Sequence, residues 1–255
     1  MKNLIDLVFL LILEMETRQM IIEMKYTDSI KDNPIKNDWN DASIEELLNL
    51  CDESIELDLE QLNKIQEILL ELEHNDSEDH TFFDAFKSFW EIMGSFLLIE
   101  IDIQTAFRYI LQFGNQDVEN KNNDLYYRFF VRRIYTLAYE TLNKGLLKKE
   151  GQGMQKLRNF VTKETYDLFL TQKKNLQDCL EKKEKEFHSI RNVGEAHKDR
   201  VDLQIKALES ISVKDSFEYI FSLNVNLENY RIALINLLGN IIKTVDSSQK
   251  NPVFK

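Results

Sequence analysis

Glycine and proline are so rare in this chain that they restrict its fold more than any other feature. Among 255 residues there are only 7 glycines and 2 prolines. Sheet-containing proteins need these residues in their turns and loops, because glycine supplies positive φ angles and proline presets a turn. The sequence therefore predicts an all-α fold. It also excludes the glycine-rich phosphate loops, since neither GxGxxG nor GxxxxGK[S/T] occurs.

Charge is distributed unevenly along the chain. The formal net charge of −12 excludes an overall basic nucleic-acid binder. Residues 38–80 hold 15 acidic residues and one lysine, a net charge of −14, whereas residues 141–200 have a net charge of +5. Apolar residues recur every three or four positions in the acidic part, which predicts helix with a solvated acidic side. The other interpretation is a docking face for a basic partner or for the basic half of the same molecule.

A polar break at residues 74–80 suggests a boundary between two regions. Residues 1–79 are predicted to form an acidic helical segment, and residues 80–255 a helical bundle of four to five long helices. His74 and His80 flank the acidic residues of the break, but their spacing matches neither HExxH nor an EF-hand loop, so we expect a linker. The bundle is expected to contain an aromatic core stretch at 82–113 and helices over about 125–147, 154–189 and 227–245.

The start of the chain holds a short apolar run. Residues 4–13 are interrupted by Asp6 and are too few to span a bilayer. They have the length of a signal-peptide core, but only Lys2 precedes them as a charge and no small-residue cleavage site follows, so a buried helix is favoured. Residues 1–23 are expected to be dispensable, because alternative starts follow at Met15, Met20 and Met24.

The cysteines indicate the compartment. Cys51 and Cys179 form neither a disulfide framework nor a CxxC motif. This usage is typical of a reducing environment. We therefore expect a cytoplasmic protein that does not contact a membrane.

One segment combines two side chains that can act on a phosphodiester. Residues 187–200 read FHSIRNVGEAHKDR. Arg191 is a permanent cation whose donors suit a phosphate. His197 titrates near neutral pH and can remove a proton from a ribose hydroxyl. On a regular helix the two would lie about 120° apart, so they share a site only if the chain bends, as Gly194 between them allows.

This spacing resembles the signature of HEPN domains, in which an arginine and a polar residue precede a histidine. Here Asn192 is the polar residue, and five residues separate Arg191 from His197. The stretch LYYRFFVRRIYTLAYE at 125–140 is also similar to the second helix of HEPN proteins related to abortive-infection systems. The similarity covers about residues 80–245, and residues 1–79 have no counterpart.

The resemblance implies a homodimer whose two motifs face each other and a metal-independent endoribonuclease that acts in phage defence or stress response. His197 would be the general base or acid at the ribose 2′-hydroxyl, and the product would carry a 2′,3′-cyclic phosphate. Arg191 would bind the scissile phosphate, and Asn192 would orient the phosphate or the histidine. Lys198 and Arg200 would contact the RNA backbone, unless they are only solvated charges. No cofactor is implied, and an antitoxin or neighbouring defence protein is a candidate partner.

Two residues beside the motif limit this interpretation. Asp199 stands where some toxin–antitoxin members carry a tyrosine that a nucleotidyltransferase partner modifies, so we do not expect that regulation here. Glu195 lowers the local positive potential, and with Arg191 it has the i, i+4 spacing of an ordinary surface ion pair. Two other functions stay open: a non-catalytic HEPN-like protein that binds a nucleotide, RNA or a protein, and an unrelated helical adaptor.

Overall fold

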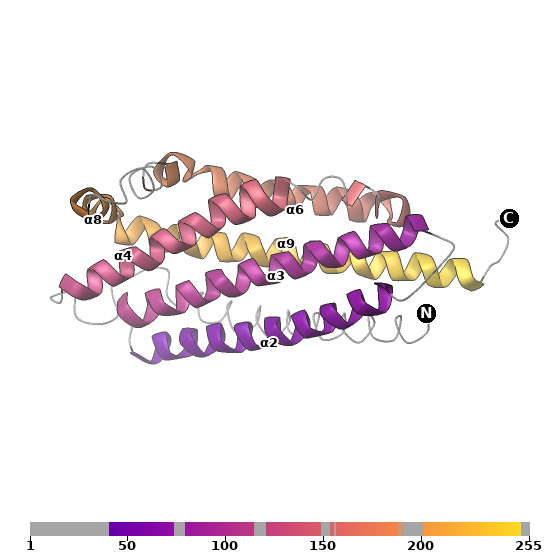
Figure 1. The fold of residues 1–255 in the computed structure, drawn as a ribbon, viewed down its shortest axis with the longest axis horizontal. Coiled ribbons are helices and arrows are strands. Elements are labelled where there is room, and N and C mark those ends of the chain that lie inside the picture. Colours follow the sequence, from indigo (N-terminus) through magenta and orange to yellow (C-terminus); the bar gives the residue numbers. More distant parts are fainter. Residues whose placement is uncertain are drawn as a thin grey trace.

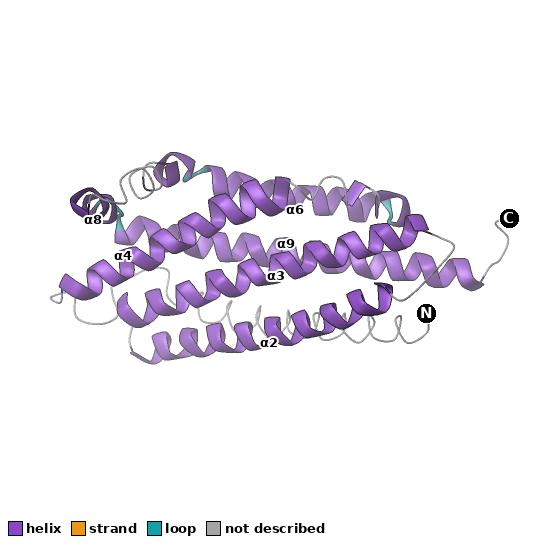
Figure 2. Ribbon diagram, in the orientation of Figure 1, coloured by secondary structure: helices purple, strands orange, loops and turns teal. Residues whose placement is uncertain are grey.

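The structure is a computed structural model that describes residues 41–73, 80–114, 121–148, 154–155, 157–188, 190 and 201–250. Within these ranges every regular element is a helix, which confirms the predicted all-α class (Figure 2). The elements are α2 (Asp41–Glu73), α3 (His80–Gly114), α4 (Lys121–Thr136), the π-helix η1 (Leu137–Leu147), the 3₁₀ turn η2 (Arg158–Phe160), α6 (Lys163–Glu181), α8 (Val201–Glu209) and α9 (Val213–Lys250).

The long helices form two packed layers. Figure 1 shows α2, α3 and α4 side by side, with α9 passing behind α3 and α4, and α6 packs against α9. Two ion pairs fix the antiparallel match of α2 and α3: Asp52 with Arg108 near one end and Glu73 with Lys87 near the other. The first is bidentate, with nitrogen–oxygen distances of 2.5 and 3.1 Å, a geometry that sets orientation as well as binding.

The core lies between the layers and is rich in aromatic rings, as expected for residues 82–113. Phe89, Trp90 and Phe96 of α3 are completely buried, and the Trp90 ring meets the Phe89 ring edge to face at 5.3 Å. Each such side chain contributes about 1.5–3 kcal/mol through burial. Among the aromatic side chains that the structure describes in this stretch, Tyr109 is the exception, because its ring is partly exposed and stacks on Phe130 of α4 at 4.7 Å.

Helix α2 contributes to the same core. Its apolar stripe runs from Leu47 through Ile65 and Ile68 to Leu72, and all four side chains are buried. The glutamates on its opposite side are exposed. The boundary expected at residue 79 lies outside the described residues, as do residues 1–40 with the apolar run at 4–13.

The predicted helix over 125–147 is present as α4 followed without a break by η1. In a π-helix each N–H reaches a carbonyl five residues back. Gly145 allows this, because a Cβ there would lie 3.3 Å from the carbonyl oxygen of Glu140.

The last helix starts 14 residues earlier than predicted, at Val213 rather than Leu227. Tyr219, Ile220 and Leu223 extend its apolar face and are buried. The hydroxyl of Ser212 accepts a hydrogen bond from the backbone N–H of Asp215 at 3.3 Å, which satisfies one donor of the first turn. Within the described ranges, no helix is long and apolar enough to cross a bilayer.

Candidate functional site

The residues that the sequence singles out lie outside the described ranges. This applies to Arg191, Asn192, His197, Lys198 and Arg200 alike. The geometry of the Arg191–His197 pair therefore stays a prediction. The described residues that lead into this segment lie beside a pocket at the junction of α4 and η1.

The helical stretch that follows α6 packs into the core of the bundle. After α6 ends at Glu181, residues 184–188 are helical again, and Lys183 pairs with Glu186 at 2.6 Å. Phe187 and Ile190 are both buried, at 3% and 4% exposure. The chain is thus anchored in the core up to the residue that precedes Arg191.

Three aromatic rings surround Phe187. Its ring centroid lies 4.7 Å from that of Tyr135, 5.8 Å from Tyr139 and 5.7 Å from Tyr219. His188 adds an edge-to-face contact with Tyr139 at 4.9 Å. Contacts of this geometry are favourable beyond burial, so the junction of α4 and η1, together with Tyr219 of α9, holds this part of the chain in one orientation.

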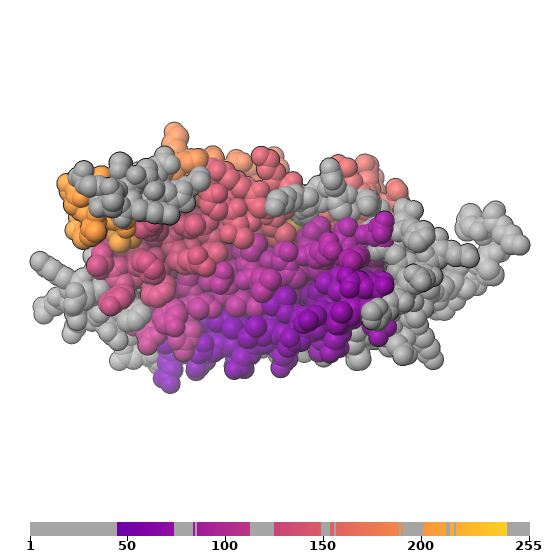
Figure 3. Space-filling view, viewed as in Figure 1, coloured from indigo at the N-terminus to yellow at the C-terminus, as the bar shows by residue number. Residues whose placement is uncertain are grey.

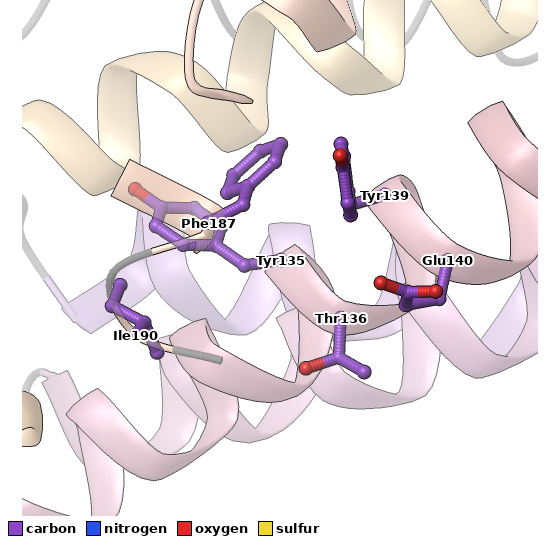
Figure 4. A pocket seen from close by; sticks show the side chains of 6 residues that line it. All are labelled: Tyr135, Thr136, Tyr139, Glu140, Phe187 and Ile190. Carbon is purple, nitrogen blue, oxygen red and sulfur yellow. The ribbon is translucent and has the colours of Figure 1, made fainter. Parts of the chain in front are cut away.

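A pocket opens beside these rings. Figure 4 shows the Tyr135, Tyr139 and Phe187 rings on one side of it and the polar Thr136 and Glu140 on the other. Ile190 also lines it. One wall of the pocket is therefore formed by the residue that directly precedes Arg191 in the sequence.

Three polar side chains converge at the edge of this aromatic cluster, and we call them the Tyr139–His188–Glu184 triad. The Tyr139 hydroxyl lies 2.6 Å from Nε2 of His188 and donates to Oε1 of Glu184 at 3.2 Å. Nε2 of His188 lies 3.7 Å from the same carboxylate oxygen. His188 and Glu184 are half-exposed, so water or a ligand can reach them while Tyr139 fixes their geometry.

A cation stands over the same tyrosine. Nζ of Lys144 lies 4.3 Å from the centre of the Tyr139 ring and 3.7 Å from a carboxylate oxygen of Glu140. Glu140 also lines the pocket. The polar rim of the pocket thus carries charges of both signs, which can hold a ligand with polar groups but do not select one charge.

Two buried hydroxyls complete the cluster. The Tyr135 hydroxyl bonds to Oγ of Ser216 at 3.1 Å, and Ser216 donates to the backbone carbonyl of Ser212. Burial raises the pKa of Tyr135 and of Tyr219 above the usual range. Among the described residues the Tyr219 hydroxyl has no hydrogen-bond partner, so its burial is not offset by a hydrogen bond.

A second polar cluster lies in the middle of the bundle, where α2, α3 and α9 meet. Arg231 of α9 is 2% exposed and pairs with Asp58 of α2 at 3.1 Å and with Glu100 of α3. Glu228 adds a third carboxylate at 3.9 Å. We call these residues the Arg231 cluster. Because Asp58 and Glu100 are also buried, they meet no solvent.

The described residues contain no group of three His, Cys, Asp or Glu side chains that could hold a metal ion. The hydroxyl, imidazole and carboxylate of the triad can bind through hydrogen bonds or move a proton between nitrogen and oxygen atoms. The Arg231 cluster can do neither for a ligand from solvent, since its charges are enclosed.

Comparison with known proteins adds no family. No family model, no curated protein and no solved structure matches the chain. The resemblance to HEPN domains therefore rests on the residues that carry it.

The sequence did not single out Tyr139 or Glu184. The i, i+4 spacing of Glu184 and His188 was a weak signal for part of the triad. No local pattern points to Tyr139 as the third member, because it lies 49 residues from His188 in the sequence.

Proposed function

We propose that this protein is a metal-independent endoribonuclease of the HEPN type that acts in phage defence or stress response. The observation that carries the proposal is the motif Arg191–Asn192–His197 in an all-α chain, directly after an anchored stretch of helix. Phe187 and Ile190 supply that anchor. A phosphate-binding arginine needs a fixed starting point, because misplacement by even 1 Å is costly in catalysis.

The chemistry follows from the residue types. In this proposal His197 removes the proton of a ribose 2′-hydroxyl, and the 2′-oxygen attacks the adjacent phosphorus. The bond to the 5′-oxygen breaks, and that oxygen takes up a proton from a second acid. Arg191 stabilises the negative charge that develops on the phosphate, and Asn192 orients it. The products are a 2′,3′-cyclic phosphate and a 5′-hydroxyl, and a homodimer would supply the second histidine.

The test is RNA cleavage in the presence of EDTA. We expect His197→Ala to lower the rate about 10²–10⁴-fold, as for loss of a general base, and Arg191→Ala about 10²–10³-fold. His80→Ala and Arg158→Ala are matched controls, because they remove the same residue types elsewhere, and both should retain the wild-type rate. A fully active His197→Ala protein would contradict the proposal.

A non-catalytic protein with the same motif is the alternative. It would bind RNA, a nucleotide or a protein without cleaving RNA. Wild-type protein that binds RNA but leaves it intact, with binding weakened by Arg191→Ala, would favour this alternative.

A further inference from the structure

The hydrogen bonds of the triad fix which nitrogen of His188 carries a hydrogen. The Tyr139 hydroxyl contacts two groups, Nε2 of His188 at 2.6 Å and Oε1 of Glu184 at 3.2 Å. A hydroxyl has one hydrogen to donate, and an ionised carboxylate can only accept. Both contacts are therefore hydrogen bonds at the same time only if Tyr139 donates to Glu184 and Nε2 of His188 donates to Tyr139.

This arrangement leaves Nδ1 as the nitrogen of His188 that can exchange a proton. Among the described residues Nδ1 has no hydrogen-bond partner, and the side chain is 43% exposed, so a ligand from solvent can reach it. When both ring nitrogens carry hydrogen, the ring forms an ion pair with Glu184, whose carboxylate oxygen lies 3.7 Å from Nε2. Because the bond at one nitrogen sets the state of the other, His188 is prepared to give or take a proton at a single atom.

The π-helix η1 holds Tyr139 in its position. Tyr139 lies in the first turn of η1 and is only 3% exposed. Lys144, five residues further along the chain, stands over its ring at 4.3 Å, and a helix that bonds residues five apart brings such a pair into line. Because π-helical turns are rare and occur frequently at functional sites, the type of helix is a second observation that points to a function for this tyrosine.

The triad is close in the sequence to the proposed reaction centre. Tyr139 lines the pocket together with Ile190, the residue that directly precedes Arg191. His188 precedes Arg191 by three residues, and three residues span at most about 11 Å even when fully extended. Figure 3 shows side chains of α4 and η1 at the surface beside α3, so the outer side of the helix that carries Tyr139 is open to a substrate. The chain thus keeps the imidazole near a phosphate that Arg191 would bind.

We propose that His188 is the acid that protonates the leaving 5′-oxygen in RNA cleavage, with Tyr139 and Glu184 as its positioning residues. The inference rests on the proposed function, and it assigns to this chain the role that a histidine of a second copy would otherwise fill. The Nδ1 proton moves to the 5′-oxygen as the bond between phosphorus and that oxygen breaks, and the electron pair of the bond stays on the oxygen. His188 is left neutral with its hydrogen on Nε2, and it takes up a new proton from water.

The other polar groups at the pocket are less suited to this step. The Tyr139 hydroxyl already bonds to both other members of the triad, and its side chain is buried. The Lys144 ammonium lies against the Tyr139 ring and pairs with Glu140 at 3.7 Å. Histidine is the side-chain type that both gives and takes protons near neutral pH, which favours His188 as the donor.

The first test uses RNA in which sulfur replaces the 5′-oxygen at one cleavage site, with EDTA present. A thiolate is a much weaker base than an alkoxide, so the sulfur leaves without taking up a proton. We expect His188→Ala to cleave ordinary RNA about 10²–10⁴-fold more slowly than the wild type, and the sulfur-containing RNA at nearly the wild-type rate. His197→Ala should be slow on both RNAs, because it lacks the base rather than the acid.

The outcomes of this test separate the inference from the proposed function. His80→Ala is the matched control and should cleave both RNAs at the wild-type rate. If the wild type cleaves RNA and His188→Ala is fully active on ordinary RNA, or equally slow on both RNAs, the inference is overturned and the proposed function stands. A wild type that leaves both RNAs intact would overturn the proposed function and this inference with it.

The second test addresses the positioning of the imidazole without any RNA. Nitrogen-15 NMR distinguishes the two tautomers of a neutral histidine ring, and the chain has only 4 histidines, so His188→Ala identifies the signal. We expect the Nε2–H form in the wild type and a mixture of both forms in Tyr139→Phe. Tyr219→Phe is the matched control, since its hydroxyl has no hydrogen-bond partner among the described residues, and it should keep the wild-type form. An Nδ1–H form in the wild type would refute the arrangement.

The same Tyr139→Phe protein links this arrangement to the reaction. It should cleave ordinary RNA about tenfold or more slowly than the wild type, the effect expected for losing a hydrogen bond to a charged group. The sulfur-containing RNA should be cleaved at nearly the wild-type rate, because the acid is not needed there. Equal slowing on both RNAs would make Tyr139 a structural residue only and overturn its assignment as a positioning residue.

Discussion

The Arg231 cluster and the Tyr139–His188–Glu184 triad place similar groups in opposite environments. In the first, a guanidinium and carboxylates from three helices are enclosed at the centre of the bundle, and Arg231, Asp58 and Glu100 are each at most 3% exposed. In the second, an imidazole and a carboxylate are half-exposed and a buried tyrosine holds them. Both clusters join residues that are far apart in the sequence.

The difference in solvent access indicates which cluster stabilises the fold and which cluster can take part in function. Enclosed charges must satisfy each other, so changing one member leaves an uncompensated charge in the interior. Half-exposed groups can be satisfied by water when a partner is lost. The first cluster is therefore expected to govern stability, and the second is available for binding or proton transfer.

The largest effect is expected from Arg231→Met. Removing the guanidinium leaves Asp58 and Glu100 buried together, which should lower the free energy of unfolding by about 3–5 kcal/mol. Urea denaturation followed by circular dichroism measures this. Lys87→Met is the matched control, because it breaks an exposed pair with Glu73 and should leave the free energy of unfolding nearly unchanged. Equal losses for the two variants would remove the distinction between enclosed and exposed charges.

Alkaline pH should destabilise the core around α2. Burial raises the pKa of the Cys51 thiol from 9.0 to about 12. Below pH 9 the thiol keeps its proton in both states, so its contribution to stability is fully present. Between pH 9 and 12 only the unfolded chain releases the proton, so the free energy of unfolding falls, by up to about 4 kcal/mol.

Cys51→Ala tests this assignment through the slope of the free energy of unfolding against pH, rather than through the absolute value of that free energy. The variant should lose less stability than the wild type between pH 9 and 12. Cys179→Ala is the comparison, since burial also raises the pKa of Cys179 but the Ser222 hydroxyl lowers it in part. Identical pH slopes in Cys51→Ala and the wild type would show that this thiol does not titrate differently in the two states.

Tyr135→Phe should have an intermediate effect. The change removes the buried hydrogen bond to Ser216, which itself still donates to the Ser212 carbonyl. We expect a loss of about 1 kcal/mol, read from the same urea denaturation. Tyr219→Phe is the control, because its hydroxyl has no partner among the described residues, and it should be neutral or stabilising.

The smallest effect on stability is expected at the triad. His188→Ala removes an edge-to-face ring contact and a hydrogen bond to Tyr139, both at a half-exposed position. The loss should be about 1 kcal/mol or less, since water replaces the imidazole. Thermal unfolding of this variant beside Arg231→Met compares the two clusters directly. A loss of the same size as at Arg231 would make the triad a structural element.

The helical content and the aromatic core could be predicted from residue patterns, whereas the ends of the helices were predicted less accurately. The start of α9 was missed because residues 213–226 contain serine and asparagine, which interrupt the apolar pattern in the sequence. In the structure Ser216 is buried and bonded to Tyr135, and Asn224 is buried as well. The HEPN-type function and its site residues stay predictions.

The sequence by itself determined that the chain is all-α, which stripe of α2, α3 and α4 faces inward, and that α2 is acidic. These properties are local, because a helix repeats every 3.6 residues and its periodicity can be read from neighbouring positions. Only the tertiary structure decided that Asp58 is the buried one among the acidic residues of α2 between Glu45 and Glu73. Asp58 goes inside because Arg231, 173 residues away, meets it there. The triad likewise exists only because η1 and the chain after α6 pack together, and no local pattern encodes such a meeting.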